Sequence, residues 1–95
     1  KVVSSYQGLY ASHIRNEDDR VEEAVAEALQ ICEQASVALQ ISHLKACNKV
    51  NWYRTEKLLE MIHQALDSGL PVNADRYPYI AYGTGLGTFL PFWVR

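Results

Sequence analysis

The sequence lacks several features that would place the chain in other classes of protein. Its 95 residues contain no apolar run of the roughly 18 to 20 residues that span a bilayer. The first residues also lack the basic-then-apolar layout of a signal peptide. Lysine and arginine number 9 against 11 acidic residues, and they form no run that would bind a polyanion. We therefore expect a cytoplasmic protein with neither nucleic acid nor a membrane as its partner.

Cysteine is also scarce. The chain has 2 cysteines, Cys32 and Cys47, and their spacing matches neither a CxxC motif nor a metal-binding ribbon. Cys32 falls on the apolar side of an expected helix and Cys47 in a loop, so we expect no disulfide between them. We interpret Cys32 as a small core residue and Cys47 as a loop thiol close to His43.

Three short apolar runs predict β-strands, at residues 8–13, 37–41 and 71–77. Residues 1–6 are expected to be the stub of an earlier helix. Amphipathic stretches separate the three runs, and this alternation predicts parallel strands joined by right-handed crossovers. The predicted fold class is therefore α/β, with a parallel βαβαβ arrangement in one small domain.

The two helices have recognisable ends in the sequence. The first is expected to begin near Asp19, because Asp19 and Glu22 resemble a capping box. The second is expected from about residue 52 to residue 68, since Gly69 suits the left-handed position after a helix and Pro71 cannot continue one. Their apolar stripes comprise Val21, Val25, Ala28, Leu29, Cys32 and Ala35 in the first helix, and Leu58, Leu59, Ile62, Ala65 and Leu66 in the second.

The end of the chain, residues 80–95, is rich in glycine and then strongly apolar. Such a segment is expected to act as a loop or lid that covers another surface or is itself covered. No later element is present to receive it. We therefore expect the domain to be incomplete.

Two similar motifs end the first two strands, Ser12-His13-Ile14-Arg15 and Ser42-His43-Leu44-Lys45. The carboxyl ends of adjacent parallel strands open into one crevice, with strands about 4.8 Å apart. A single histidine near a strand is more often a hydrogen-bonded structural residue than a ligand. Two histidines at equivalent strand ends favour a shared metal ion, for which zinc, iron, copper and nickel are all chemically suitable.

Charged and aromatic side chains accompany the two histidines. Arg15 and Lys45 are either ordinary charges at strand ends or cations that hold a carboxylate substrate. Tyr77 and Asp75, at the end of the third strand, add a phenol donor and a carboxylate, although Asp75 also suits a turn. His63 is expected to face solvent on the polar flank of the second helix.

Three ordered motifs resemble those of the D-aminoacylases, which are N-acyl-D-amino-acid deacylases of the amidohydrolase superfamily. They are YASHIRNE at 10–17, QISHLK at 40–45 and DRYPY at 75–79, followed by GTGL. The likeness covers nearly the whole chain. It implies that residues 1–95 are part of one (β/α)₈ TIM-type barrel domain, about strands five to seven. The barrel would be incomplete, because eight such units require roughly 250 residues.

The resemblance also implies roles for individual residues. His13 and His43 would be ligands of a zinc ion, and Lys45 and Tyr77 would hold the α-carboxylate of a small-molecule N-acyl-D-amino acid, with Arg15 as their neighbour. The implied reaction is zinc-assisted hydrolysis of the amide to a carboxylate and a free D-amino acid. The general-base aspartate, the His-x-His pair and the cysteine ligand of the family pattern are missing from these residues. We therefore expect the chain alone to be inactive, and to associate with the remainder of the barrel or with itself.

A second hypothesis comes from a different class of function. The chain would then be a non-catalytic α/β module that binds a partner protein through the apolar segment 80–95. A His-x-His strand encoded upstream and a strand-end aspartate encoded downstream would favour the enzyme. The preferred substrate side chain, the number of metal ions and the oligomeric state are not specified by these residues.

Overall fold

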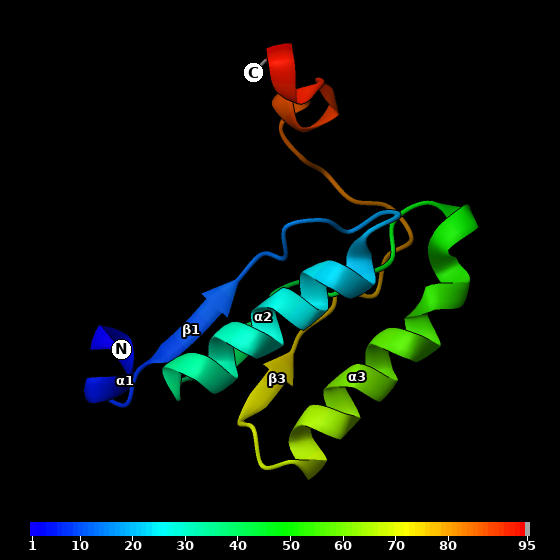
Figure 1. The fold of residues 1–95 in the computed structure, drawn as a ribbon. Helices are drawn as coiled ribbons and strands as arrows, with labels where there is room; N and C mark the ends of the chain where they lie inside the picture. Colours follow the sequence, from blue (N-terminus) through cyan, green and yellow to red (C-terminus); the bar gives the residue numbers. More distant parts are fainter. Residues whose placement is uncertain (95) are drawn as a thin grey trace.

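Strands and helices alternate along the chain, as the sequence predicts (Figure 1). The computed structural model describes residues 1–94. Its elements in chain order are α1 (Val2–Ser5), β1 (Leu9–Ser12), α2 (Val21–Ala35), β2 (Ala38–Ile41), the 3-10 helix η1 (Lys49–Arg54), α3 (Thr55–Asp67), β3 (Val72–Ala74) and the 3-10 helices η2 (Leu86–Phe89) and η3 (Phe92–Val94).

The strands form a parallel sheet in the order β1-β2-β3, so β2 is the central strand. Leu39 and Ile41 occupy alternate positions of β2 and belong to one buried cluster with residues of both α2 and α3. Both helices therefore cover the same face of the sheet. The cluster consists of Ile14, Val21, Ala24, Val25, Ala28, Cys32, Leu39, Ile41, Ala46, Leu58, Ile62, Ala65 and Val72. The predicted parallel βαβαβ arrangement is confirmed.

The opposite face of the sheet is open in residues 1–94. Because side chains alternate along a strand, Leu9, Ala11 and Asn73 point away from the helices, and all three are exposed. Leu9 keeps 55% of its surface in contact with solvent. Parallel sheets are usually covered on both faces. The described residues thus supply one of the two layers that such a sheet normally has.

Helix α2 begins two residues later than the sequence predicts. It starts directly after Arg20, and no side chain caps its first turn. The Asn16 side-chain oxygen accepts a hydrogen bond from the backbone N–H of Arg20, the residue just before the helix, at 3.2 Å. Glu22 pairs with Arg54 at 2.8 Å instead of reaching back to the helix start. The predicted capping box between Asp19 and Glu22 was therefore wrong.

Helix α3 also begins later than predicted, at Thr55 instead of about Trp52. The intervening residues form the 3-10 helix η1. The predicted end is close to the observed one, and Gly69 has the left-handed φ of +90° that a residue after a helix adopts. Leu59 and Leu66 belong to the predicted stripe but remain 48% and 45% exposed, so the buried face is narrower than the apolar one.

Strand β3 is shorter than the predicted run 71–77. Its partner β2 stops because His43 has a φ of +44°, which lies outside the extended region. The backbone of Asp75 still donates to Ile41 at 3.1 Å and accepts from Leu44 at 2.8 Å, but His43, which lies between these two partners, has left the extended region. The end of β3 is therefore set by the end of its neighbour.

Residues 80–94 lead away from the sheet and helices and end in η2 and η3 (Figure 1). Ile80 is 94% exposed and Trp93 is 85% exposed. Much of the apolar segment predicted to cover another surface is therefore exposed in the described part of the chain, although Tyr82 lies near the Lys45 ammonium. The hypothesis that it binds a partner protein stays a prediction.

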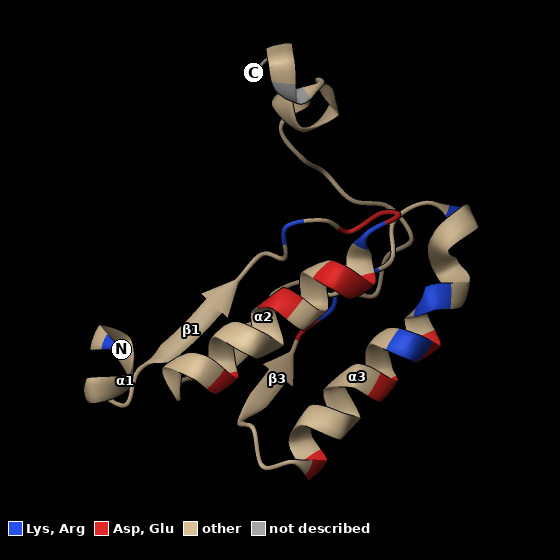
Figure 2. Cartoon of the chain, viewed as in Figure 1, with Lys and Arg blue, Asp and Glu red and all other residues tan. Residues whose placement is uncertain are grey.

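Charged side chains are distributed over the helices and loops. Acidic residues lie along α2 and α3, and basic residues lie in the loops and near the starts of these helices (Figure 2). None of the described helices is both long and apolar enough to cross a bilayer. Cys32 and Cys47 are buried free thiols.

Candidate metal centre

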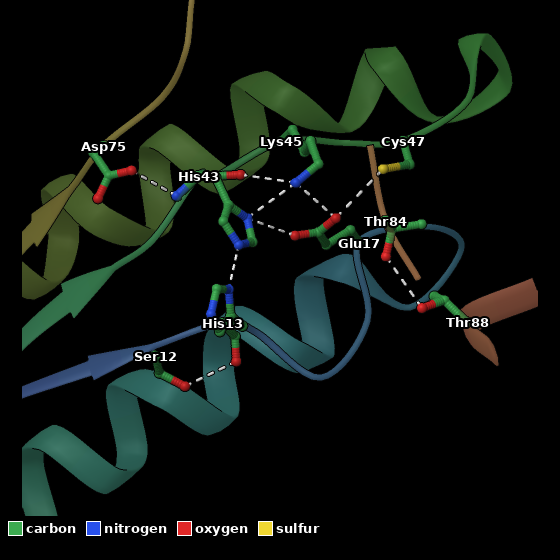
Figure 3. Close-up of polar contacts among 9 residues, drawn as sticks. All are labelled: Ser12, His13, Glu17, His43, Lys45, Cys47, Asp75, Thr84 and Thr88. Carbon is green, nitrogen blue, oxygen red and sulfur yellow. Dashed lines mark hydrogen bonds and ion pairs between the residues drawn. The ribbon is translucent and has the colours of Figure 1, made fainter. Parts of the chain in front are cut away.

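The two predicted metal ligands meet at one end of the sheet. His13 directly follows β1, and His43 lies two residues beyond the end of β2. Their ring centroids are 4.5 Å apart, and Nδ1 of His13 contacts Nε2 of His43 (Figure 3). The convergence that the paired motifs predict is therefore observed, while metal binding by the pair stays a prediction.

The backbone of His43 is held by Asp75. The Asp75 carboxylate accepts one hydrogen bond from the His43 backbone N–H at 2.7 Å and another from the Gln40 side-chain amide at 2.7 Å. These two donors, the His43 backbone first, lower the pKa of Asp75 below its ordinary value. The hydrogen bond to Asp75 thus supports the unusual left-handed conformation of the His43 backbone.

Glu17 contacts three groups around the histidine pair from the loop between β1 and α2. Its carboxylate lies 2.9 Å from Nδ1 of His43 and 2.7 Å from Nζ of Lys45 (Figure 3). The Cys47 thiol donates to the same carboxylate at 3.6 Å, and burial raises the pKa of this thiol, which keeps its proton in place. Only 21% of the Glu17 side chain is exposed.

Lys45 is buried although it carries a charge, with 9% of its side chain exposed. Besides Glu17, its ammonium donates to the backbone oxygen of His43 at 3.1 Å and lies 5.5 Å from the ring centroids of both Tyr77 and Tyr82. The buried Tyr77 hydroxyl has no hydrogen-bond partner among residues 1–94. An ammonium and an unpaired phenol therefore lie side by side next to the histidines.

Arg15 is oriented differently from the other predicted site residues. Its guanidinium forms two hydrogen bonds with the Glu27 carboxylate on α2, at 2.8 and 2.9 Å, and its side chain is 78% exposed. The residue still borders the cleft but does not point toward Lys45. His63 is exposed on α3, as the sequence predicts.

These residues surround an open cleft of about 1190 Å³ at the carboxyl ends of the strands. Its lining combines loops that follow all three strands with the segment after residue 80, as expected for a ligand site in a parallel α/β sheet. Within residues 1–94, no group of three or more His, Cys, Asp or Glu side chains is arranged to hold a metal ion. The described chain thus offers two converging nitrogen donors and no complete coordination shell.

No family model matches the chain. It is 38% identical over 79 residues to an N-acyl-D-glutamate deacylase of Alcaligenes xylosoxydans xylosoxydans, and 33% identical over 84 residues to a D-aminoacylase of the same organism. The two alignments cover 83% and 88% of this chain.

Solved structures give the same result for the fold. A zinc and phosphonate complex of an N-acyl-D-glutamate deacylase from Bordetella bronchiseptica superimposes with a TM-score of 0.79 at 41% identity, and a D-aminoacylase with a TM-score of 0.77 at 31% identity. Each match covers 82% of this chain. The chain is similar in sequence and fold to one segment of the D-aminoacylases.

That segment is a small part of a D-aminoacylase. The chain spans 16% and 17% of the length of the two relatives, and 16% of each solved structure. One of the D-aminoacylase structures concerns a binuclear metal centre, and the deacylase structure holds zinc with a phosphonate that mimics the tetrahedral intermediate of the reaction. Metal chemistry is therefore a property of the proteins that this chain resembles.

Sequence reasoning did not identify Glu17 as a site residue. In the motif that resembles the D-aminoacylases, Glu17 ends the run YASHIRNE, four residues after His13. Its position in the loop directly after a strand was the available signal, because such loops line the ligand site of a parallel sheet. Its contacts with His43 and Lys45 depend on how two separate loops fold together, and no sequence spacing reports that.

Proposed function

We propose that this chain is part of a zinc-dependent amidohydrolase that hydrolyses N-acyl-D-amino acids to a carboxylate and a free D-amino acid. The observation that carries the proposal is the facing pair of ring nitrogens, His13 Nδ1 and His43 Nε2, in a segment similar to the D-aminoacylases. Imidazole nitrogen is a ligand that zinc prefers. The activity is proposed for the whole protein, which would include residues beyond those described.

The residues present fit a zinc ion as part of its coordination shell. The lone pairs of His13 Nδ1 and His43 Nε2 would repel each other, so a proton or a cation must lie between these two nitrogens. A catalytic zinc normally has three protein ligands, so we propose that the third comes from outside residues 1–94. When bound, zinc lowers the pKa of a water molecule and polarises the acyl carbonyl.

The proposed setting for this site is a (β/α)₈ barrel. Its support is the parallel sheet with both helices on one face and an open second face, which in a barrel points to the interior. The histidines lie at the carboxyl ends of the strands, where barrel enzymes have their active sites. The open edges of β1 and β3 would be paired by neighbouring strands of the same barrel.

Lys45 and Tyr77 are proposed to bind the α-carboxylate of the substrate. An ammonium has three N–H donors, and Lys45 directs two of them to Glu17 and to the His43 carbonyl. The third N–H, which lies near Nδ1 of His43 at 3.0 Å, and the unpaired Tyr77 hydroxyl would then turn to two carboxylate oxygens when substrate binds. Arg15 stays a proposed neighbour of this clamp, once released from Glu27.

The proposal is tested first by removing the metal. The complete gene product that contains this sequence is expected to lose hydrolysis of N-acetyl-D-amino acids on chelation and to recover it with zinc, because the metal would supply the activated water and polarise the acyl carbonyl. Hydrolysis is measured before chelation, after dialysis and after addition of zinc. Activity that persists in protein shown to be free of metal would contradict the proposal.

A second prediction concerns the carboxylate clamp. Replacing Lys45 with methionine, which keeps the length and packing of the side chain, is expected to raise KM about 10- to 100-fold with a smaller change in kcat, because one charged hydrogen bond to the substrate is lost. The matched control is Lys57→Met, which removes an exposed lysine of α3. An unaltered kcat/KM in the Lys45 variant would exclude this role.

A further inference from the structure

One ring nitrogen of His43 has two competing partners. Its Nδ1 lies 2.9 Å from a carboxylate oxygen of Glu17 and 3.0 Å from the ammonium nitrogen of Lys45 (Figure 3). A carboxylate accepts a hydrogen bond only from a protonated Nδ1, whereas an ammonium donates only to an unprotonated one. The two contacts therefore select opposite tautomers of the neutral imidazole.

We propose that Glu17 is a positioning residue that holds His43 in the tautomer able to bind the metal. This inference rests on the proposed function, because it concerns the same pair of histidines. A neutral imidazole carries one N–H. With that proton on Nδ1 and directed at Glu17, the lone pair of Nε2 points toward His13. With the proton on Nε2, this nitrogen has no lone pair to offer.

The surroundings of Glu17 favour the first arrangement. The carboxylate is four-fifths enclosed, so its hydrogen bonds act in a medium where charge interactions are stronger than in bulk water. It also gives the Lys45 ammonium an anionic partner at 2.7 Å, which is a better acceptor than a ring nitrogen. Glu17 thus acts twice, by accepting from Nδ1 and by drawing Lys45 away from it.

The tautomer of His43 with its proton on Nδ1 also leaves an N–H of Lys45 available for the substrate. An Nδ1 that donates to Glu17 accepts nothing, so the Lys45 N–H that would otherwise bind the ring is free. Loss of the Glu17 charge would direct this N–H to Nδ1 and place the imidazole proton on Nε2. One carboxylate therefore links the ligand geometry of His43 to the availability of the Lys45 cation.

The central experiment replaces Glu17 with glutamine in the complete gene product and measures zinc affinity by equilibrium dialysis. The side chain keeps its size but loses its charge, and zinc affinity is expected to fall about 10- to 100-fold, as for other residues that orient metal-bound histidines. The matched control is Glu22→Gln, which removes a carboxylate of α2 that pairs with Arg54 and does not line the cleft. This control is expected to bind zinc as the wild type does.

A double variant separates positioning from a general structural effect. If Lys45 competes for Nδ1, adding Lys45→Met to Glu17→Gln is expected to restore part of the lost zinc affinity, because the glutamine oxygen then accepts from Nδ1 unopposed. A variant whose loss is structural would not recover. Nitrogen-15 spectra of histidine-labelled wild-type protein provide a readout that needs no variant, with His43 Nδ1 expected to be protonated and Nε2 not.

The outcomes distinguish this inference from the proposed function. If His43→Ala keeps its zinc, the proposed function fails and the inference with it. If His43→Ala loses zinc while Glu17→Gln binds it like the wild type, only the inference is overturned. An unprotonated Nδ1 of His43 in the zinc-bound wild type would also overturn it.

Discussion

Replacing His43 with alanine is expected to lower the affinity of the protein for zinc by more than about 100-fold. Loss of a residue that only orients a metal-bound histidine costs about 10- to 100-fold, and His43 is a proposed ligand. Its ring nitrogen faces His13, and the third histidine, His63, does not line the cleft. Hydrolysis of N-acetyl-D-amino acids is expected to fall with the metal content.

The matched control for this variant is His63→Ala. His63 is an exposed histidine of α3, away from the cleft. Its replacement therefore removes an imidazole, as His43→Ala does, but leaves the site intact. Zinc content and rate are measured in both variants by metal analysis and by release of the D-amino acid. Equal zinc content in the two variants would remove His43 from the metal site.

Replacing Leu39 with alanine is expected to lower the free energy of unfolding by about 2–5 kcal/mol. Leu39 is fully buried in the central strand, where it packs in the cluster shared by the sheet and both helices. The cavity left behind cannot close easily, because β2 is held on both sides by β1 and β3. This is a large share of the 5–15 kcal/mol that stabilises a typical domain.

Urea denaturation measures this change, with Leu59→Ala as its control. Leu59 carries the same side chain on α3 but is 48% exposed, so a change of less than about 1 kcal/mol is expected. If both variants unfold at the same urea concentration, the buried cluster around β2 does not dominate the stability of the fold.

Much of the fold could be predicted because local patterns and tertiary packing agree. Apolar runs and helical stripes indicated the three strands and the helices α2 and α3, and Gly69 marked the end of α3 correctly. The predicted ends of helices and strands were wrong where a residue made a contact other than the expected one. Glu22 pairs with Arg54 instead of capping the start of α2, and β3 ended early, where His43 of the neighbouring strand end leaves the extended conformation. Such competition depends on three-dimensional contacts.

For the candidate site, too, some contacts could be predicted from the sequence and others could not. The convergence of His13 and His43 followed from two motifs at equivalent strand ends, since parallel pairing brings such ends together. The carboxylate of Glu17 was missed, because its partners belong to a loop that is remote in sequence. The ion pair of Arg15 with Glu27 was not predicted, because strand position alone does not report such a contact, and the place of Arg15 beside the clamp stays a prediction.

The left-handed backbone of His43 has a consequence for the energetics of ligand capture. Its φ of +44° is uncommon for a residue with a side chain, and the hydrogen bond from its N–H to Asp75 maintains it. The backbone entropy of placing this residue is therefore lost when the chain folds. In the proposed zinc site the backbone of His43 would be preorganised, so that more of the intrinsic metal–nitrogen affinity would be available for binding.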